Sequence, residues 1–403
     1  MSAPSSRRTF LKNASLGTAA LGLASAAQAE PAKPPATPIQ GFEESQQAQT
    51  AGKPWQPVSE RKIRMGIVGY GVCRFGAQFS LQHHPNVEVV AVSDLFPDRC
   101  QALAEACQCE KTYPSLEKMV KDNSIEAVFV ATDAPSHARH CLEVLKHGKH
   151  VATAVPALWA DLEDADRLLE TVKSTGLNYM MFETSCFHND LYAMRKIYRA
   201  GRFGKLVYSE GEYYHHACGV IPSYKDWRIG LPPQWYPTHS NAYYVGVAGG
   251  SFTEVSCLGM PSLRQELQPA NNKYRNPYGT EIALLRTSEG GMARMGVSWD
   301  TPGLGGEVGR VRGQQGSMAG MNYQGLEKEL PELRKPALPP SVRPGGHGGS
   351  HGYLGHEFVL SILEQRRPLV DVVWALNMTA AGIVSHQSAL KDGELMKIPQ
   401  YRW

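Results

Sequence analysis

Short apolar runs and amphipathic stretches alternate over the first half of the chain, beginning near residue 62. Five of the runs predict buried strands, at residues 63–68, 87–93, 127–131, 150–153 and 178–182. Helical spacing of apolar residues predicts helices at 137–147 and 162–174, and a helix-like stretch through Phe79 follows the first strand. Strand–helix units of this length predict an α/β fold with a doubly wound parallel sheet and right-handed crossovers.

The second half has a different pattern, with strands first and long helices near the end. Four strands are predicted, at residues 206–214, 281–287, 292–299 and 308–312. Helical periodicity then returns at 353–363 and 374–389. This order predicts an α+β domain.

The first 60 residues show neither the strand-like runs nor the helical periodicity of the two halves described above. Residues 6–12 read Ser-Arg-Arg-Thr-Phe-Leu-Lys, and a mildly apolar run after them ends in the small-x-small sequence Ala27-Gln28-Ala29. This order resembles a twin-arginine export signal at residues 1–29, so we expect a periplasmic or otherwise exported protein. Residues 30–60, rich in Pro, Gln and Ala, are expected to form an extended tether.

Composition narrows the classes of protein and partner. The 403 residues are 42% apolar, which indicates a globular chain, and we expect two domains, at 61–182 and 183–403. Three of the 41 basic residues lie in the expected signal, which leaves 38 against 38 acidic residues. We therefore expect neither nucleic acid nor, after signal cleavage, a membrane as partner, but a small, largely uncharged molecule.

The eight cysteines form no C-x-x-C pair, so free thiols are favoured, with one or two disulfides left open.

The strand ends carry a candidate nucleotide site. Gly69-Tyr70-Gly71 follows the first strand, where glycines allow a tight turn and let backbone approach a pyrophosphate, and we assign Gly69, Gly71 and Val72 to cofactor binding. Asp94, after the second strand, can accept hydrogen bonds from both ribose hydroxyls and would repel a 2′-phosphate, which favours NAD over NADP. The alternative for Asp94 is a helix N-cap or a turn.

Three more residues follow the strand at 127–131, at the sheet edge where such folds bind ligands. We assign Thr132, Asp133 and His137 to cofactor binding as well. These features and the sequence Gly-Lys-His-Val at 148–151 resemble the Gfo/Idh/MocA family, named for glucose-fructose oxidoreductase and inositol dehydrogenase. The resemblance covers nearly the whole mature chain. It implies an NAD-binding Rossmann domain and a second domain whose open, mainly antiparallel sheet closes the nicotinamide pocket and often forms a dimer interface, so we expect a homo-oligomer, a dimer or a tetramer.

Two departures from the family concern catalysis. Family dehydrogenases usually carry Glu-Lys-Pro where this chain has Ala154-Val155-Pro156, and the lysine acts near the reacting hydroxyl. The family's Asp-x-x-x-His, which follows a Gly-Gly pair, falls here on residues 254–258 without a histidine. An ordinary alcohol dehydrogenase mechanism therefore lacks its usual base.

Two other motifs supply candidates for the catalytic residues. Tyr236-Pro237-Thr238-His239, in a stretch at 231–241 expected to be a loop, and Gly346-His347-Gly348-Gly349 resemble motifs of the NAD-dependent α-N-acetylgalactosaminidases, a glycoside hydrolase branch of the family. In that branch, as the resemblance implies, tightly held NAD oxidises the sugar C3 hydroxyl, the C2 proton is lost, the C1 substituent leaves, water adds and the hydride returns. We assign catalysis to His239 and Tyr236. The alternative is that both are structurally satisfied residues of an aromatic loop.

Substrate contacts are less well defined. We assign them to Glu183, His188, Tyr214, Trp227 and His347. A functional tyrosine of the glycosidase branch falls on Phe187 here, and Tyr213, Tyr214 or His188 could replace it. Aromatic residues at 213–244 could stack on a sugar or form a hydrophobic cluster or a subunit interface. The histidine spacings match no closed zinc pattern, so no metal is expected.

Together these features predict an exported NAD-dependent enzyme that processes or hydrolyses glycosides, with a carbohydrate as its small-molecule partner. Free dinucleotide is scarce outside the cytoplasm, so export favours NAD that is retained and recycled in one active site. A conventional NAD-linked sugar or polyol dehydrogenase with His239 as base is one alternative. A catalytically silent sugar-binding relative is another.

Overall fold

The computed structural model describes residues Gly52–Trp403, which belong to one compact unit. Residues 1–51, with the expected export signal and most of the expected tether, lie outside the described residues. The first described residues form neither helix nor strand, and the Gly52 N–H donates to the carbonyl of Lys335 (2.8 Å). This stretch is therefore anchored to a later part of the chain.

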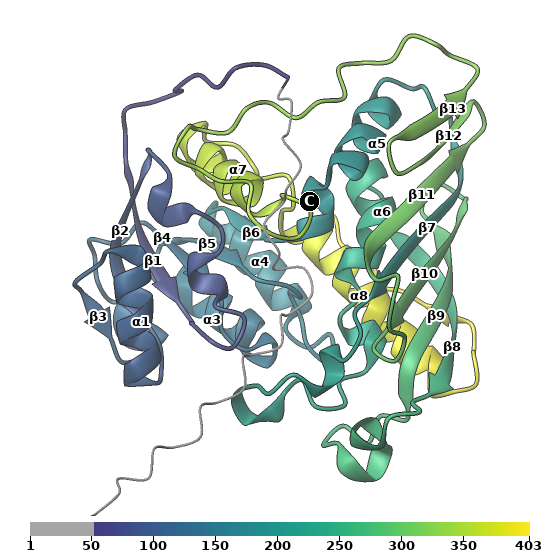
Figure 1. Ribbon diagram of the computed structural model, residues 1–403, viewed down its shortest axis with the longest axis horizontal. Coiled ribbons are helices and arrows are strands. Elements are labelled where there is room, and N and C mark those ends of the chain that lie inside the picture. Colours follow the sequence, from purple (N-terminus) through teal and green to yellow (C-terminus); the bar gives the residue numbers. More distant parts are fainter. Residues whose placement is uncertain (1–51) are drawn as a thin grey trace, which may run out of the picture. The chain divides into compact units, whose positions relative to one another are not determined.

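Six parallel strands form the first sheet, in the order β3-β2-β1-β4-β5-β6 (Figure 1). They are β1 (Ile63–Val68), β2 (Val87–Ser93), β3 (Thr112–Tyr113), β4 (Ala127–Val130), β5 (His150–Thr153) and β6 (Tyr179–Met181). The helices between them are α1 (Pro97–Cys107), α2 (Leu116–Met119), α3 (His137–Lys146) and α4 (Ala165–Thr175). Every pairing is parallel and the strand order switches direction beside β1, which confirms the doubly wound α/β sheet.

The periodicity of the sequence explains these elements. All four residues of β4 are buried, as expected of a central parallel strand with helices on both sides. In α4, Ala165, Leu168, Leu169 and Val172 are buried, and their spacing places them on one face of the helix.

The predicted helix through Phe79 is wrong. The segment after β1 holds only two short 3₁₀ helices, η1 (Phe75–Ala77) and η2 (Leu81–His83). Arg74 and Ser80, which precede them, have φ values of 51° and 54°. Left-handed backbone at both positions prevents a continuous α-helix.

Eight strands form the second sheet, in the order β13-β12-β11-β7-β10-β9-β8-β14. They are β7 (Leu206–Tyr214), β8 (Phe252–Pro261), β9 (Tyr278–Thr287), β10 (Met292–Ser298), β11 (Gly306–Gly313), β12 (Gly316–Ala319), β13 (Asn322–Gly325) and β14 (Met396–Lys397). Only β7 and β10 pair in parallel, which confirms the mainly antiparallel sheet. The remaining helices are α5 (Asn189–Arg199), α6 (Thr238–Ala248), α7 (His351–Leu363) and α8 (Val372–Ala389), and the 3₁₀ helices are η3 (Ala134–Ser136), η4 (Thr184–Phe187), η5 (Cys218–Val220), η6 (Tyr224–Asp226), η7 (Pro233–Trp235), η8 (Gln265–Leu267) and η9 (Pro269–Asn271).

Helices α6 and α8 pack on one face of this sheet (Figure 1). The approach of α6 to β7 requires a residue without a side chain, because a Cβ at Gly211 would collide with the carbonyl oxygen of Ser240. The Asn241 side chain also donates to the carbonyl of Met378 (2.7 Å), which ties α6 to α8. The start of α6 is thereby fixed against both the sheet and α8.

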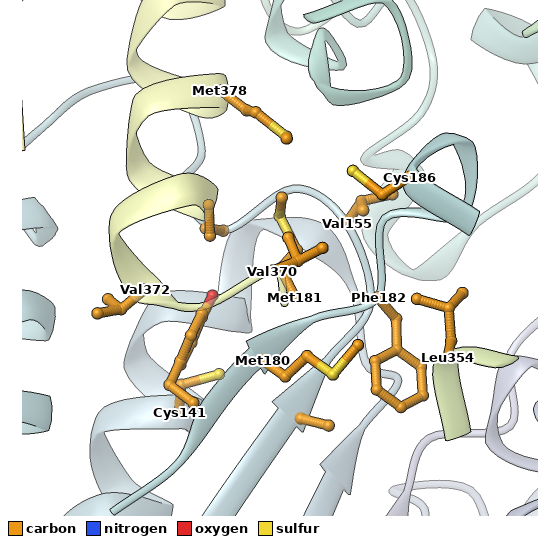
Figure 2. Close-up of a cluster of buried hydrophobic side chains, with 14 of the residues drawn as sticks. Cys141, Val155, Met180, Met181, Phe182, Cys186, Leu354, Val370, Val372 and Met378 are labelled. Atoms are coloured by element: carbon orange, nitrogen blue, oxygen red, sulfur yellow. The ribbon is translucent and has the colours of Figure 1, made fainter. Parts of the chain in front are cut away.

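A buried cluster joins the first sheet to α7 and α8. Figure 2 shows Met180, Met181 and Phe182, at the end of β6, beside Leu354 of α7 and Met378 of α8. All five side chains are buried. The chain that leaves β6 toward Glu183 therefore starts from rigid packing.

The described residues also test the expectations about membrane spans and cysteines. Among residues 52–403, no helix has the length and hydropathy that a membrane crossing requires. All eight cysteines lie in this part of the chain as free thiols, and every one except Cys73 is buried. The domain boundary near residue 182 stays a prediction.

We expect Phe182→Ala to lower the free energy of unfolding by about 3–5 kcal/mol, because it leaves a cavity between β6 and α7. Urea denaturation followed by circular dichroism measures the effect. Phe96→Ala, at a side chain that is 38% exposed, is the control and should cost about 1 kcal/mol or less. Equal losses from the two substitutions would contradict the role of this cluster.

Candidate functional site

Residues from both halves of the chain line a pocket. The first half contributes Cys73, Phe75, Phe79, Ala154, Val155 and Phe182. The second half contributes Thr184, Tyr213, His215, Ile221, Arg228, Tyr236, His239 and His347. The first set follows β1, β5 and β6, so the pocket lies at the carboxyl edge of the parallel sheet, where doubly wound folds bind ligands.

The glycine turn after β1 fits a pyrophosphate. Gly69 has a φ of 101°, and a Cβ there would collide with the carbonyl of Ala131, so this position requires glycine. A Cβ at Gly71 would meet nothing within 4 Å, which leaves open space for a ligand beside the backbone. Gly76 packs against the Gly69 carbonyl and takes the place of the third glycine of the usual fingerprint. Val72 is 47% exposed, and its assignment to cofactor binding stays a prediction.

Asp94 supports this turn directly. Its carboxylate accepts hydrogen bonds from the N–H of Tyr70 (2.7 Å) and of Phe96 (2.9 Å). Asp94 therefore makes the turn contact named as its alternative, without capping α1, and also lies beside the glycine turn, where a cofactor ribose would need an acceptor.

Thr132, Asp133 and His137 stabilise the end of β4. The ring nitrogens of His137 lie 2.9 Å from the Pro156 carbonyl and 3.2 Å from the Thr132 carbonyl, and the residue is 1% exposed. Burial lowers the pKa of His137. Asp133 accepts a hydrogen bond from the hydroxyl of Ser136 (2.9 Å). The His137 ring thus joins the segments after β4 and β5, and its assignment to cofactor binding stays a prediction.

One of the two catalytic candidates, His239, lies next to Glu183. Glu183 caps η4 by accepting the Ser185 N–H (3.0 Å), and the same oxygen lies 2.8 Å from Nδ1 of His239. His239 is in the first turn of α6, so the loop expected at 231–241 is wrong for residues 238–241. Because α6 is buried all round, its sequence lacks the amphipathic pattern of a surface helix.

A second carboxylate, Glu307 of β11, completes the cluster. It accepts hydrogen bonds from the hydroxyls of Thr184 (3.0 Å) and Ser185, and its carboxylate lies 3.7 Å from His239 Nδ1. Burial by itself lowers the pKa of His239, but Glu183 and Glu307 outweigh it and raise that pKa to about 9. Burial acts to raise the pKa of Glu307, and the neighbouring histidines outweigh it and lower that pKa.

Aromatic rings and one cation enclose His239. The ring centroids of Tyr213 and Tyr236 lie 4.4 Å and 5.7 Å from that of His239. Burial raises the pKa of Tyr236, so its phenol stays protonated. The Arg228 guanidinium stacks on Trp227 at 4.2 Å, and among residues 52–403 no carboxylate lies within ion-pair distance of it. A buried guanidinium on the pocket wall is suited to polar groups of a ligand.

Of the remaining substrate candidates, His188 and His347 lie near Glu307, and Trp227 and Tyr214 do not. His188 Nε2 lies 3.2 Å from Glu307 without an aligned hydrogen bond, and His347 Nε2 lies 4.0 Å from Glu307. Trp227 packs behind Tyr236, 6.5 Å between ring centroids. Tyr214 does not match its expected role, because alternation along β7 turns it to the face opposite Tyr213. Tyr213, which lines the pocket, takes the position expected of Tyr214.

The structure also shows where the two segments lie in which this chain differs from the family's catalytic motifs. Val155 lines the pocket at the position of the family lysine, so that wall is apolar. Residues 254–258 lie on β8, where Glu254 pairs with Arg286 (2.8 Å) and with Lys397. That segment belongs to the edge of the second sheet and not to the pocket, so the absence of a histidine there does not affect the site.

Glu183, His239 and Glu307 each place one possible metal-ligand atom within 4.8 Å of the others. Spacing in the sequence could not reveal this group, because its members come from three distant segments. The same atoms are hydrogen-bonded within the cluster, since His239 Nδ1 contacts Glu183 and the Thr184 hydroxyl donates to Glu307.

Comparison with known proteins agrees with this geometry. A family model described as "Oxidoreductase family, NAD-binding Rossmann fold" matches residues 63–183. A glycosyl hydrolase family 109 protein of Solibacter usitatus is 24% identical over 98% of this chain and 97% of its own length. The family 109 protein 1 of Bacteroides fragilis is 29% identical, but the match spans only 38% of that protein and 41% of this chain.

Solved structures share the fold at low identity. A scyllo-inositol dehydrogenase from Lactobacillus casei with bound NAD(H) and scyllo-inositol superposes with a TM-score of 0.67, at 16% identity over 84% of this chain and 99% of that one. The WlbA dehydrogenase from Bordetella pertussis, in complex with NADH and UDP-GlcNAcA, has a TM-score of 0.66, at 19% identity over 86% of this chain and 100% of that one.

We expect Asp94→Ala to weaken NAD binding by about 10- to 100-fold, the loss of one or two hydrogen bonds to a charged acceptor. NADP binding should fall less, because the repulsion of its 2′-phosphate is also removed. Titration of cofactor-stripped protein with NAD and NADP measures both affinities. Asp98→Ala, at an acid in the first turn of α1, is the control and should change neither. An unchanged preference between the cofactors in Asp94→Ala would contradict the assignment.

Proposed function

We propose that this chain, which belongs to the Gfo/Idh/MocA family of NAD-binding oxidoreductases, is an exported sugar-active enzyme that retains one NAD and oxidises a sugar hydroxyl transiently. The observation that carries the proposal is the buried Glu183–His239 pair, in which His239 lines the same pocket as Cys73 and Val155 from the segments after β1 and β5. The names of the family 109 relatives, and the sugar-like ligands named for the solved neighbours, support a carbohydrate substrate.

When bound, NAD accepts a hydride from a substrate carbon and can return it. The residues placed to hold it are Gly69, Gly71 and Asp94, and the last fits the NAD ribose better than a 2′-phosphate. The apolar wall at Val155 and the aromatic rings lower the polarity around the carbon that gives up the hydride.

His239 is the proposed base for the hydroxyl proton in its neutral form, whose population grows as the pH approaches the raised pKa of about 9. Glu183 holds Nδ1, which turns the opposite edge of the imidazole, with Nε2, toward the pocket that His239 lines. Tyr236 remains a neutral phenol and can donate a hydrogen bond to a sugar oxygen. Since the position of the family lysine is Val155, His239 takes over its role at the hydroxyl.

Oxidation of the sugar hydroxyl to a ketone makes the proton on the adjacent carbon acidic. Once that proton is removed, the substituent on the next carbon can leave by elimination. Addition of water and reduction of the ketone then complete glycoside hydrolysis without net consumption of NAD. The proposed export supports this redox-neutral cycle, because a retained cofactor needs no exchange. The second candidate is a conventional NAD-linked sugar dehydrogenase, which the dehydrogenases among the solved neighbours favour.

The uncovered face of the second sheet supports a homo-oligomer, a dimer or a tetramer. Strands β7 to β11 each expose a large apolar side chain, more than half accessible: Val207, Leu258, Leu284, Met292 and Val308. Helices α6 and α8 cover the other face. A second copy of this chain is the partner that we propose for the uncovered face.

We expect the purified protein to release close to one NAD per chain on denaturation and to cleave a glycoside without accumulating NADH. Extraction of the dinucleotide and a panel of aryl and natural glycosides, followed for sugar release and nicotinamide absorbance, measure both. Net NADH would identify the conventional dehydrogenase. Absence of any dinucleotide would sink the retained-cofactor proposal.

We expect His239→Ala to reduce turnover at least ~100-fold, because a positioned general base contributes about that much. His147→Ala, at an exposed residue that ends α3, is the matched control and should keep the normal rate. Initial rates on the best glycoside of the panel measure both variants. A near-normal rate for His239→Ala would remove this side chain from the mechanism.

A further inference from the structure

Residues 219–230 of the second half form a loop that reaches the carboxyl edge of the first sheet, and we call this loop the strap. Its two ends are joined, because the N–H of Gly230 donates to the carbonyl of Gly219 (3.0 Å). At its tip, Lys225 and Asp226 have φ values of 51° and 52°. Left-handed backbone at two successive residues other than glycine costs free energy, which the contacts of the strap must offset.

Two aromatic contacts join the strap to segments that follow strands of the first sheet. After β2, the ring of Phe96 meets that of Tyr224 edge-on, with 5.9 Å between the ring centroids. After β5, the ring of Trp159 meets that of Trp227 edge-on, at 5.2 Å. Because β1 and β4 lie between β2 and β5, the strap spans the middle of the carboxyl edge of this sheet.

The strap also lies beside the positions that we assign to the cofactor. Phe96 is two residues beyond Asp94, and its N–H donates to the Asp94 carboxylate (2.9 Å). At the glycine turn, the guanidinium of Arg228 lies 3.9 Å from Sγ of Cys73, which is two residues beyond Gly71. The strap therefore meets the first half both at the ribose position and at the pyrophosphate position of the proposed NAD site.

One side of the strap is fixed to residues 272–276 of the second half. The hydroxyl of Tyr274 donates to the carbonyl of Trp227 (2.6 Å), and the side-chain amide of Asn276 donates to the carbonyl of Gly230 (3.2 Å). A Cβ at Gly230 would collide with the side chain of Asn272. Hydrogen bonds and close packing thus hold this side in place.

The contact between Tyr224 and Phe96 is easier to break. Both rings are partly accessible to solvent, and Phe96 is 38% exposed. An edge contact between two such rings contributes only modestly to the free energy of the closed arrangement. It can therefore open locally while the rest of the strap stays attached.

We propose that the strap is a gate over the NAD site and that the contact between Phe96 and Tyr224 is its latch. The latch joins two protein residues, so the gate must open both when NAD enters and when it leaves. A closed gate slows release without strengthening the binding of NAD. The inference rests on the proposed function, because a cofactor that is recycled in place must be released slowly.

The rates of NAD entry and release test the gate without turnover. Exchange of isotope-labelled NAD from loaded protein into excess unlabelled NAD measures release. Rapid mixing of cofactor-stripped protein with NAD, followed by tryptophan fluorescence, measures entry. We expect Tyr224→Ala to raise both rate constants about 3- to 10-fold, the effect of losing one aromatic edge contact, and to leave the dissociation constant of NAD unchanged.

Phe96→Ala breaks the latch from the other half of the chain and should change both rate constants by the same factors. The double variant should show no further increase, because each single substitution already removes the contact. Tyr323→Ala is the matched control, since it removes a ring contact of similar separation, 5.8 Å to Phe203, at the far edge of the second sheet. It should change neither rate constant.

Unchanged release from folded Tyr224→Ala or Phe96→Ala protein would overturn the gate. Faster release without faster entry would overturn it as well, because the rings would then bind NAD directly. Additive effects in the double variant would show that the two rings do not act as one latch. Phe96 is exposed, so its variant decides the question even if Tyr224→Ala does not fold. Net NADH in the glycoside assay overturns the proposed function instead, since both rates are measured with added NAD.

Discussion

Two buried carboxylates share one imidazole, and the pairing of these charges constrains the rest of the pocket. Neither Glu183 nor Glu307 could be buried alone without a large cost in free energy. The end of β6, the first turn of α6 and the middle of the second sheet must therefore meet at one place. This requirement explains why Gly211 lies beneath α6, where any side chain would push the helix, and His239 with it, out of reach of the carboxylates.

The packing that stabilises these elements also holds the side chains of the candidate site in position. Glu183 directly follows Phe182, which is packed in the cluster of Figure 2, so the core that joins the two sheets also directs this carboxylate. On the other side, Glu281 of β9 accepts the N–H of Gln234 (2.8 Å) and pairs with His386 of α8 (2.7 Å), which holds the segment that leads to Tyr236. The geometry of the candidate site therefore depends on buried polar pairs.

Much of the fold could be predicted because its strands are short apolar runs; those at 63–68, 87–93 and 206–214 match the structure to the residue. The helix through Phe79 was wrong because left-handed backbone at Arg74 and Ser80 has no clear sequence signal. The first turn of α6 falls in the stretch expected to be a loop because a helix that is buried on all sides has no amphipathic pattern. Glu307 was missed because only the register of β11 with β7 brings it to His239. The predicted residues that line the pocket, Tyr236, His239 and His347, belong to local motifs.

The central claim is that His239, held between two carboxylates, works on a sugar hydroxyl beside a cofactor bound at the glycine turn. A crystal structure of the protein with NAD and an unreactive glycoside tests it most directly. The account predicts the ribose on Asp94 and a sugar hydroxyl within hydrogen-bond distance of His239 Nε2, about 2.6–3.2 Å. A sugar bound elsewhere, or a nicotinamide ring that does not enter the pocket lined by Val155 and His239, would contradict it.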